Sequence, residues 1–509
     1  MLSRLFGKKS DHPMADIKSA RALLDDLPRN DVFRSATELT DWIELVADRE
    51  EFRLADQFAV LNLLDETAQF YARKLACEYF MLPDMNTFQG NRLCRVLGNL
   101  SRHTAHAYYA MFSRYCNGDK GCAAIKAQLP LLVARAVRAM REQLKYAAIN
   151  YESHNGKIWR DLAQFYRHAE QQQYLDVPLS LYSALSGRAS VKSELGQLLA
   201  WHACGIDSLS PRSTHLTERI IAQYGSSIEI SANLAGQSLF GFDLARPRDP
   251  VRVNFDATVH SLMRYIGMAD MQASLNALIK TLEKNRVPQE LNLGGVFAAE
   301  QVLEAAQHVL TYLVAPPIRL SKRRELSTFL NVVVGYENVL GRCKDAGGKS
   351  GDYPLAQWTL ENANSSGFCA KYSVRGTDSL CIGNLLGIET AGVPRLGVAI
   401  VRRISRTVEG QLHVGAEVLS DHVSEVFLRQ SVCIGYDNVR SVLWMHAKPG
   451  SDMGKVQLLM QAERFSMQRS LKIRFEGKNY LLIPDELQAK GLDYDLACFS
   501  VVEQEETEE

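Results

Sequence analysis

Apolar residues recur at intervals of three and four positions through most of the first 315 residues. The spacing is clear between Leu61 and Leu75, between Leu93 and Leu100, and between Leu131 and Met140. This period places the apolar side chains on one face of a helix, so it predicts successive amphipathic helices. We therefore expect residues 13–315 to form an all-α bundle or an irregular helical array.

The pattern loosens between about residues 205 and 255. This stretch contains the turn-rich runs SLSPRST, YGSS, GQSLFGF and ARPRDP, in which Gly, Pro and Ser are frequent. Two interpretations stay open for it. The stretch is either a hinge between two helical bundles, and so a sub-boundary, or an excursion on the surface of one bundle.

The period changes after Pro316 and Pro317, which end the helical pattern. Short β-branched or apolar runs bounded by Gly, Pro, Asn or Asp now predict strands. The first set suits a small antiparallel β-barrel over residues 316–425: Phe329–Val334, Trp358–Leu360, Leu396–Ile404 and Leu412–Leu419. A further set over residues 426–503 predicts a second small β unit, either a second barrel or an extension of the first: Val439–His446, Val456–Met460, Leu471–Phe475, Tyr480–Ile483 and Cys498–Val502.

The expected fold is therefore multidomain α + β, with the helical domain first and the β units after it. Residues 1–12 are expected to be a flexible N-terminus, and residues 504–509 an acidic tail. No apolar run reaches the ~18 residues of a membrane span. The ten cysteines are scattered without a CxxC pair, which favours a reducing cytoplasm over a disulfide scaffold.

Charge and composition narrow the function classes. Lys and Arg together number 58, as do Asp and Glu, so the formal net charge is zero. A protein that coats DNA or RNA usually has an excess of Lys and Arg, so we expect no DNA or RNA partner.

No acid–base pair or nucleophile triad has supporting spacing, so we expect no enzyme and no catalytic residue. His103 and His106, with Cys94 or Glu78 nearby, are more typical of a polar helix face than of a zinc site, and we expect no metal and no cofactor.

Two local runs carry candidate binding chemistry. RLSKRR, residues 319–324, concentrates guanidinium groups that suit phosphate oxygens and guanine edges. ENANSSG, residues 361–367, is a small polar run whose amides and hydroxyls suit hydrogen bonding to a ligand. Taken alone, the first is also typical of a solvated turn at a domain junction, and the second of an ordinary hairpin turn.

These two runs, in this order along the chain, resemble the sequence motifs of the PilZ family. That family has an arginine pair spaced RxxxR, met here by Arg319 and Arg323, followed by [D/N]xSxxG. The second motif is met by Asn362, Asn364 and Gly367, with Asn364 where Ser is usual. The runs IGNLLGI, LGVAIVRR and VGAE, starting at residues 382, 396 and 414, resemble later strands of the family. The resemblance covers about residues 316–420, and Tyr336–Gln357 looks like an insertion in the first hairpin.

The resemblance implies a bacterial, cytoplasmic receptor for cyclic di-GMP. Its ligand-binding residues would be Arg319, Arg323, Arg324, Asn362, Asn364, Ser365 and Gly367. The helical domain would bind a protein partner that controls motility, pili, secretion or exopolysaccharide, and a homo-oligomer is possible. In the family, the segment that carries RxxxR wraps over the barrel when ligand binds, so a ligand-dependent change is expected at residues 314–326.

One alternative stays open. Some PilZ-like domains with degraded motifs do not bind the nucleotide and act as adaptors. The substitution at Asn364 and the long gap between residues 324 and 361 are compatible with such an adaptor, which would act by protein–protein interaction alone.

Overall fold

The computed structural model divides the chain into two compact units, residues 1–318 and 319–509, which are described separately below. The residues that the structure describes are 14, 16–49, 51–81, 87–152, 156–185, 187–236, 238–253, 260–314, 323–345, 355–373, 380–390, 395–407, 410–429, 441–446 and 454–504. Among these residues, no helix combines the length and the apolar character that crossing a bilayer requires.

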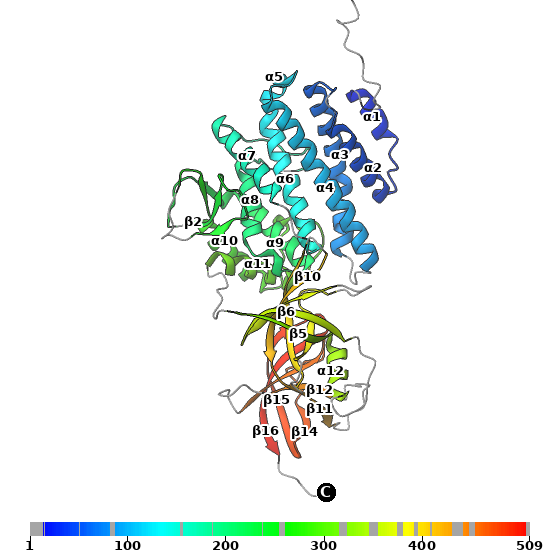
Figure 1. The fold of residues 1–509 in the computed structure, drawn as a ribbon, viewed down its shortest axis with the longest axis vertical. Helices are drawn as coiled ribbons and strands as arrows, with labels where there is room; N and C mark the ends of the chain where they lie inside the picture. The colour runs from blue at the N-terminus through cyan, green and yellow to red at the C-terminus, as the bar shows by residue number, and fades with distance from the viewer. Residues whose placement is uncertain are drawn as a thin grey trace, which may run out of the picture. The chain divides into compact units, whose positions relative to one another are not determined.

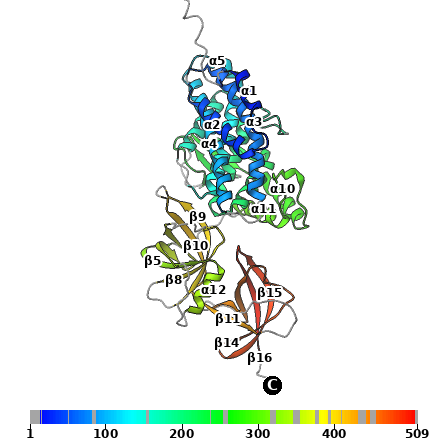
Figure 2. The same ribbon diagram turned by 90° about the vertical axis from the view of Figure 1, so that its right-hand side faces the viewer.

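The first unit is built mainly from α-helices, as the sequence predicts. Figures 1 and 2 show α2, α3 and α4 lying side by side, and these helices contact one another. The α-helices described in this unit are α1 (Ile17–Asp25), α2 (Val32–Ala47), α3 (Leu54–Met81), α4 (Thr87–Cys116), α5 (Cys122–Ile125), α6 (Leu129–Ile149), α7 (Lys157–Gln171), α8 (Val191–Ala203), α9 (Pro211–Gln223), α10 (Ala269–Leu282) and α11 (Ala299–Val314).

Side-chain caps fix where several helices begin. The Asp16 carboxylate accepts a hydrogen bond from Ser19 N at the start of α1, and Asp31 does the same for Arg34 N at the start of α2. Ser190 forms a capping box with Ser193 before α8. These caps accept bonds from backbone N–H groups that have no partner within the helix.

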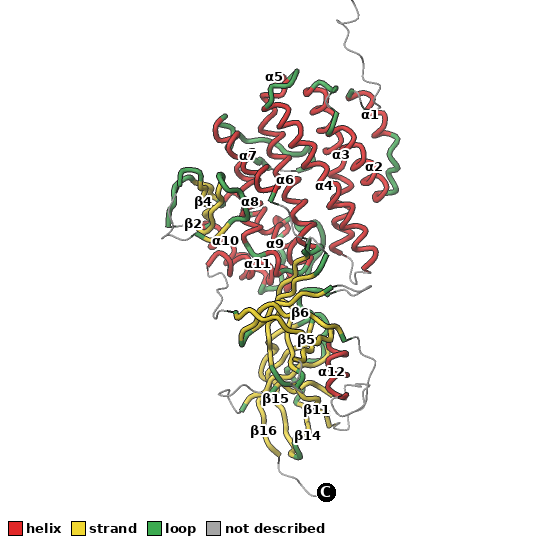
Figure 3. The backbone as a smooth tube through the Cα atoms, in the orientation of Figure 1, coloured by secondary structure: helices red, strands yellow, loops and turns green. Residues whose placement is uncertain are grey.

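The turn-rich stretch near residues 205–255 contains both a helix and strands. The helix α9 lies within it, and four strands from this stretch and just beyond form an antiparallel sheet of order β1-β4-β2-β3 (Figure 3). Ile228, just before β1, packs closely against α8. A Cβ built on Gly196 of α8 would lie 3.1 Å from the Cγ2 atom of Ile228. The strands are β1 (Glu229–Ser231), β2 (Ser238–Asp243), β3 (Val251–Arg252) and β4 (Met263–Gly267).

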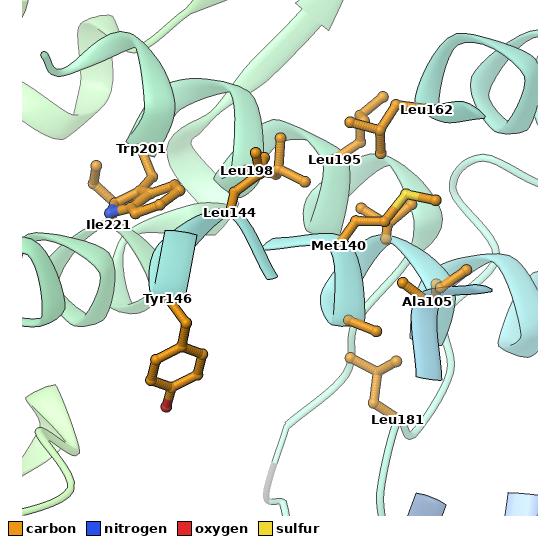
Figure 4. Packing of buried hydrophobic residues seen from close by; sticks show 14 of the residues in the cluster. Ala105, Met140, Leu144, Tyr146, Leu162, Leu181, Leu195, Leu198, Trp201 and Ile221 are labelled. Carbon is orange, nitrogen blue, oxygen red and sulfur yellow. The ribbon is translucent and has the colours of Figure 1, made fainter. Parts of the chain in front are cut away.

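One apolar core joins the helices of the first unit. Figure 4 shows Met140 and Leu144 of α6 beside Leu195 and Leu198 of α8, all of them buried. Trp201 is fully buried, and its indole N–H donates to Thr214 O at 3.3 Å. Burial with a satisfied polar atom is the arrangement that a core tryptophan requires.

The second unit begins with a closed barrel of six antiparallel strands (Figure 2), in the order β10-β7-β6-β5-β8-β9. The segment expected as an insertion after β5 forms in part a helix, α12 (Tyr336–Asp345). The strands are β5 (Arg324–Val334), β6 (Ala356–Asn364), β7 (Gly367–Tyr372), β8 (Leu385–Thr390), β9 (Gly397–Arg406) and β10 (Leu412–Ser420). The expected antiparallel barrel is therefore present.

The rest of the second unit forms another closed six-stranded barrel, of order β11-β12-β13-β16-β15-β14. It is a barrel of its own rather than an extension of the first. Val333 and Val339 from the first barrel and α12 pack with Leu443 and Leu459 of the second in one apolar cluster. The strands are β11 (Val423–Arg429), β12 (Ser441–Met445), β13 (Lys455–Gln461), β14 (Leu471–Phe475), β15 (Lys478–Lys490) and β16 (Tyr494–Gln504).

Candidate functional site

The polar run that resembles the second PilZ motif forms the hairpin between β6 and β7. Strand β6 ends at Asn364, and β7 begins at Gly367, opposite it. Asn364 Oδ1 accepts hydrogen bonds at 3.1 Å from both the backbone N and the hydroxyl of Ser366. Asn364 therefore stabilises the turn from within, as Asn commonly does in tight turns. Ser365 lies exposed at the tip of the turn.

Gly367 lies where this hairpin packs most closely on a neighbouring strand. A Cβ at this position would approach Ala416 O of β10 to 2.5 Å. The backbone N of Val418 in β10 also donates to Ser366 O at 3.0 Å. The hairpin is therefore held against β10, and any larger residue at position 367 would push the two apart.

Arg323 is the motif arginine that the structure brings to this hairpin. Its Nη1 donates to Asn362 Oδ1 at 3.1 Å. Its Nη2 lies 3.6 Å from the point that a Cβ on Gly367 would occupy. The half-buried guanidinium thus lies beside two of the three residues that match [D/N]xSxxG.

The remaining predicted residues take different positions. Arg324 begins β5, is exposed, and pairs with Ala363 across the strands. Arg319 lies outside the described residues. The structure therefore brings together Arg323, Asn362 and Gly367, with Asn364 and Ser365 in the adjoining turn.

Strands β6, β7 and β10 also bring together three side chains that the sequence analysis missed: Glu361, Cys369 and His413. One ligand-capable atom from each lies within 4.8 Å of the others. The β6–β7 register shifts between Leu360 and Asn362, and Glu361 lies at this irregularity. Strand alternation predicts in part which of these side chains share a face of the sheet. The pairing of residue 413 with residue 371, however, cannot be predicted from the sequence.

The histidines weighed for a metal site lie elsewhere and have carboxylate partners. His103 Nδ1 lies 3.6 Å from Glu44 Oε1, and His106 Nε2 lies 3.2 Å from Asp48 Oδ1. Cys94 is buried, which raises the pKa of its thiol to about 12. Both histidines therefore make polar contacts with carboxylates of α2 or of the residue that follows it.

Comparison with known proteins gives one family match. Residues 18–235 match the model described as "Cyclic-di-GMP receptor FimW, N-terminal domain". No curated protein matches the chain. The matched residues begin in α1, end just after β1, and make up less than half of the chain. This region of the first unit is therefore similar to the N-terminal domain of that receptor family.

Proposed function

We propose that the protein is a receptor for cyclic di-GMP and that the nucleotide binds on the first barrel, beside the β6–β7 hairpin. The observation that carries the proposal is the meeting of the Arg323 guanidinium with Asn362 beside Gly367. The match of residues 18–235 to a domain named for a cyclic di-GMP receptor supports it from a separate part of the chain.

The chemistry of these residues suits a cyclic dinucleotide. A guanidinium is planar, permanently charged, and forms paired hydrogen bonds to phosphate oxygens or to guanine O6 and N7. The Asn362 side chain supplies both a donor and an acceptor for a base edge. Gly367 has no side chain, so the hairpin can pack against Ala416 O of β10 and lie beside the guanidinium.

We assign supporting roles to the other motif residues. Arg319 supplies the second guanidinium of the pair, and Arg324 adds positive charge at the start of β5. Ser365 and Asn364 place hydroxyl and amide groups in the turn next to the ligand. Asn364 already accepts two bonds from Ser366, so its main task is to hold the turn.

The process that ligand binding controls is the part of the proposal that rests on the sequence alone. The helical unit binds a protein partner, and ligand binding on the barrel controls that interaction. Motility, pili, secretion and exopolysaccharide synthesis are the processes that this class of receptor suggests. The cytoplasmic location, the non-enzymatic character and any homo-oligomer belong to the same proposal.

Calorimetric titration of the full chain with cyclic di-GMP tests the proposal. Hydrogen bonds to charged groups contribute about 1.5–3 kcal/mol each, so Arg323→Ala should weaken binding roughly 10- to 150-fold. The double variant Arg319→Ala/Arg323→Ala should show no measurable heat. Arg474→Ala removes an exposed arginine from β14 of the second barrel and should bind as the wild type does.

Two outcomes would overturn the receptor assignment. Absence of heat with the wild-type chain would favour the adaptor alternative, in which the barrel has only a structural role. Disappearance of the dinucleotide over time would identify an enzyme instead. Equal affinity in the wild type and the double variant would move the site away from these arginines.

A further inference from the structure

The outer surface of strands β6, β7 and β10 carries a carboxylate, a thiol and an imidazole that converge. Cys369 is paired with Asn362 on one side and with Gly415 on the other, and His413 is paired with Lys371. Along β7, Phe368 and Ala370 are buried, whereas Cys369 and Lys371 between and beyond them are partly exposed. Strand alternation therefore places Cys369, Lys371 and His413 on the face away from the barrel core.

A single oxygen of Glu361 lies at the centre of this group. Glu361 Oε2 lies 3.7 Å from the Sγ of Cys369 and 3.5 Å from the Nδ1 of His413. The other oxygen, Oε1, is 2.7 Å from the ammonium nitrogen of Lys371. Lys371 therefore holds the carboxylate in an orientation that directs Oε2 toward the thiol and the imidazole.

Two of the three separations between these ligand atoms match a tetrahedral zinc site. Zinc–ligand distances of about 2.3 Å to sulfur and about 2.0–2.2 Å to nitrogen and oxygen give separations of about 3.6 Å for S···O and 3.4 Å for N···O. The observed distances are 3.7 and 3.5 Å. Glu361 Oε2 therefore already lies near the spacing from the thiol and the imidazole that zinc would impose, and all three ligand atoms lie within 4.8 Å of one another.

One further observation concerns the imidazole. In the described part of the chain, His413 Nε2 is buried without a hydrogen-bond partner, so the polar surroundings of this imidazole are incomplete.

We propose that Glu361, Cys369 and His413 bind a zinc ion, with water in the fourth position. A thiolate and an imidazole together favour zinc over magnesium or calcium, which prefer oxygen ligands. On binding, the Cys369 thiol releases its proton to solvent, and sulfur coordinates as the thiolate. Lys371 acts as an outer partner that orients the carboxylate. This site is separate from the proposed function, and its test does not depend on the nucleotide.

Metal titration of the full chain after chelator treatment tests the site. Cobalt(II) is the optical probe, because a cobalt–thiolate bond gives a charge-transfer band, and zinc should abolish that band by displacement. The band should appear in the wild type and be lost in Cys369→Ser. The zinc affinity of His413→Gln should fall at least tenfold. The matched control is Cys381→Ser, which changes another partly buried cysteine of this unit and should retain the band.

A second measurement uses only the wild-type chain, in case a variant fails to fold. Stoichiometric zinc should slow alkylation of Cys369 and leave the rate at Cys381 unchanged, as read by mass spectrometry. An identical cobalt spectrum in the wild type and Cys369→Ser would overturn the proposal. So would alkylation rates at Cys369 that do not respond to zinc.

Discussion

At the scale of single residues, the candidate nucleotide site depends on a close approach between two strands. Gly367 has no room for a side chain, because the backbone oxygen of Ala416 occupies the space where Cβ would lie. Arg323 and Asn362 meet next to this glycine. The position of the guanidinium and the packing of the hairpin on β10 are thus coupled.

Gly367→Ala should weaken cyclic di-GMP binding and destabilise the barrel. A Cβ placed 2.5 Å from Ala416 O forces the hairpin away from β10, and overpacking of this kind typically costs about 1–3 kcal/mol. Chemical denaturation and calorimetry measure the two effects. Gly236→Ala is the matched control, because a Cβ there meets nothing within 4 Å. Wild-type affinity in Gly367→Ala would show that the hairpin does not contact the ligand.

At the scale of elements, the helical unit contains a buried charged network between α6, α8 and α9. Arg141 of α6 lies 3.4 Å from both Glu194 of α8 and Glu218 of α9. Lys145 of α6 lies 3.4 Å from Glu218. Breaking such a pair leaves an uncompensated buried charge, which is strongly destabilising. These buried ion pairs therefore help to fix the positions of the three helices relative to one another.

His215 of α9 lies beside this network and should give the unit a measurable pH dependence. It is stacked on Phe80, and its Nε2 donates to Leu293 O at 2.8 Å. Burial lowers the pKa of His215 to about 3, and the positive charges of Lys145 and Arg219 add to this, whereas Glu218 and the bond to Leu293 act in the opposite direction. The imidazole is thus neutral in the folded protein across the physiological range.

The sign of the effect follows from linkage. In the unfolded chain, His215 takes up a proton below its ordinary pKa of about 6.5, and the folded chain does not until about pH 3. The free energy of unfolding should therefore fall by about 1.4 kcal/mol per pH unit below pH 6.5 from this residue alone. Denaturation at pH 7 and pH 5 should show a fall about 2 kcal/mol smaller in His215→Gln than in the wild type. Equal falls in the two proteins would contradict a buried neutral imidazole.

Local sequence patterns predicted most of the elements, because periods of 3.6 and 2 residues are local properties. The run Leu471–Phe475, for example, matches β14 at both ends. The sheet β1-β4-β2-β3 was not expected, since its short strands lie among turn-forming residues. Strands β7 and β11 were also missed as separate strands.

The candidate sites were predicted only in part, for a physical reason. The meeting of Arg323 with Asn362 followed from a motif that spans one strand pair. The cluster of Glu361, Cys369 and His413 depends instead on the pairing of β7 with β10 and on the irregular register near residue 361. Pairing between distant strands and irregular register are set by tertiary packing, so no local pattern reveals them.

At the scale of the whole molecule, the chain joins a helical unit to a β unit of two closed barrels. The family match lies within the helical unit, whereas Asn362 and Gly367 of the proposed site lie on the first barrel. In the function proposed above, the first barrel recognises the ligand and the helical unit binds the partner. We expect residues 314–326, which include Arg319 and Arg323, to respond to the ligand.

The most direct measurement of the central claim is amide hydrogen exchange on the full chain, with and without saturating cyclic di-GMP. We predict slower exchange in peptides covering residues 361–369 and 314–326, and little change in β14–β16 of the second barrel. The Arg319→Ala/Arg323→Ala variant should lose both effects. Protection confined to the helical unit, or no change at residues 361–369, would contradict a nucleotide site on the first barrel.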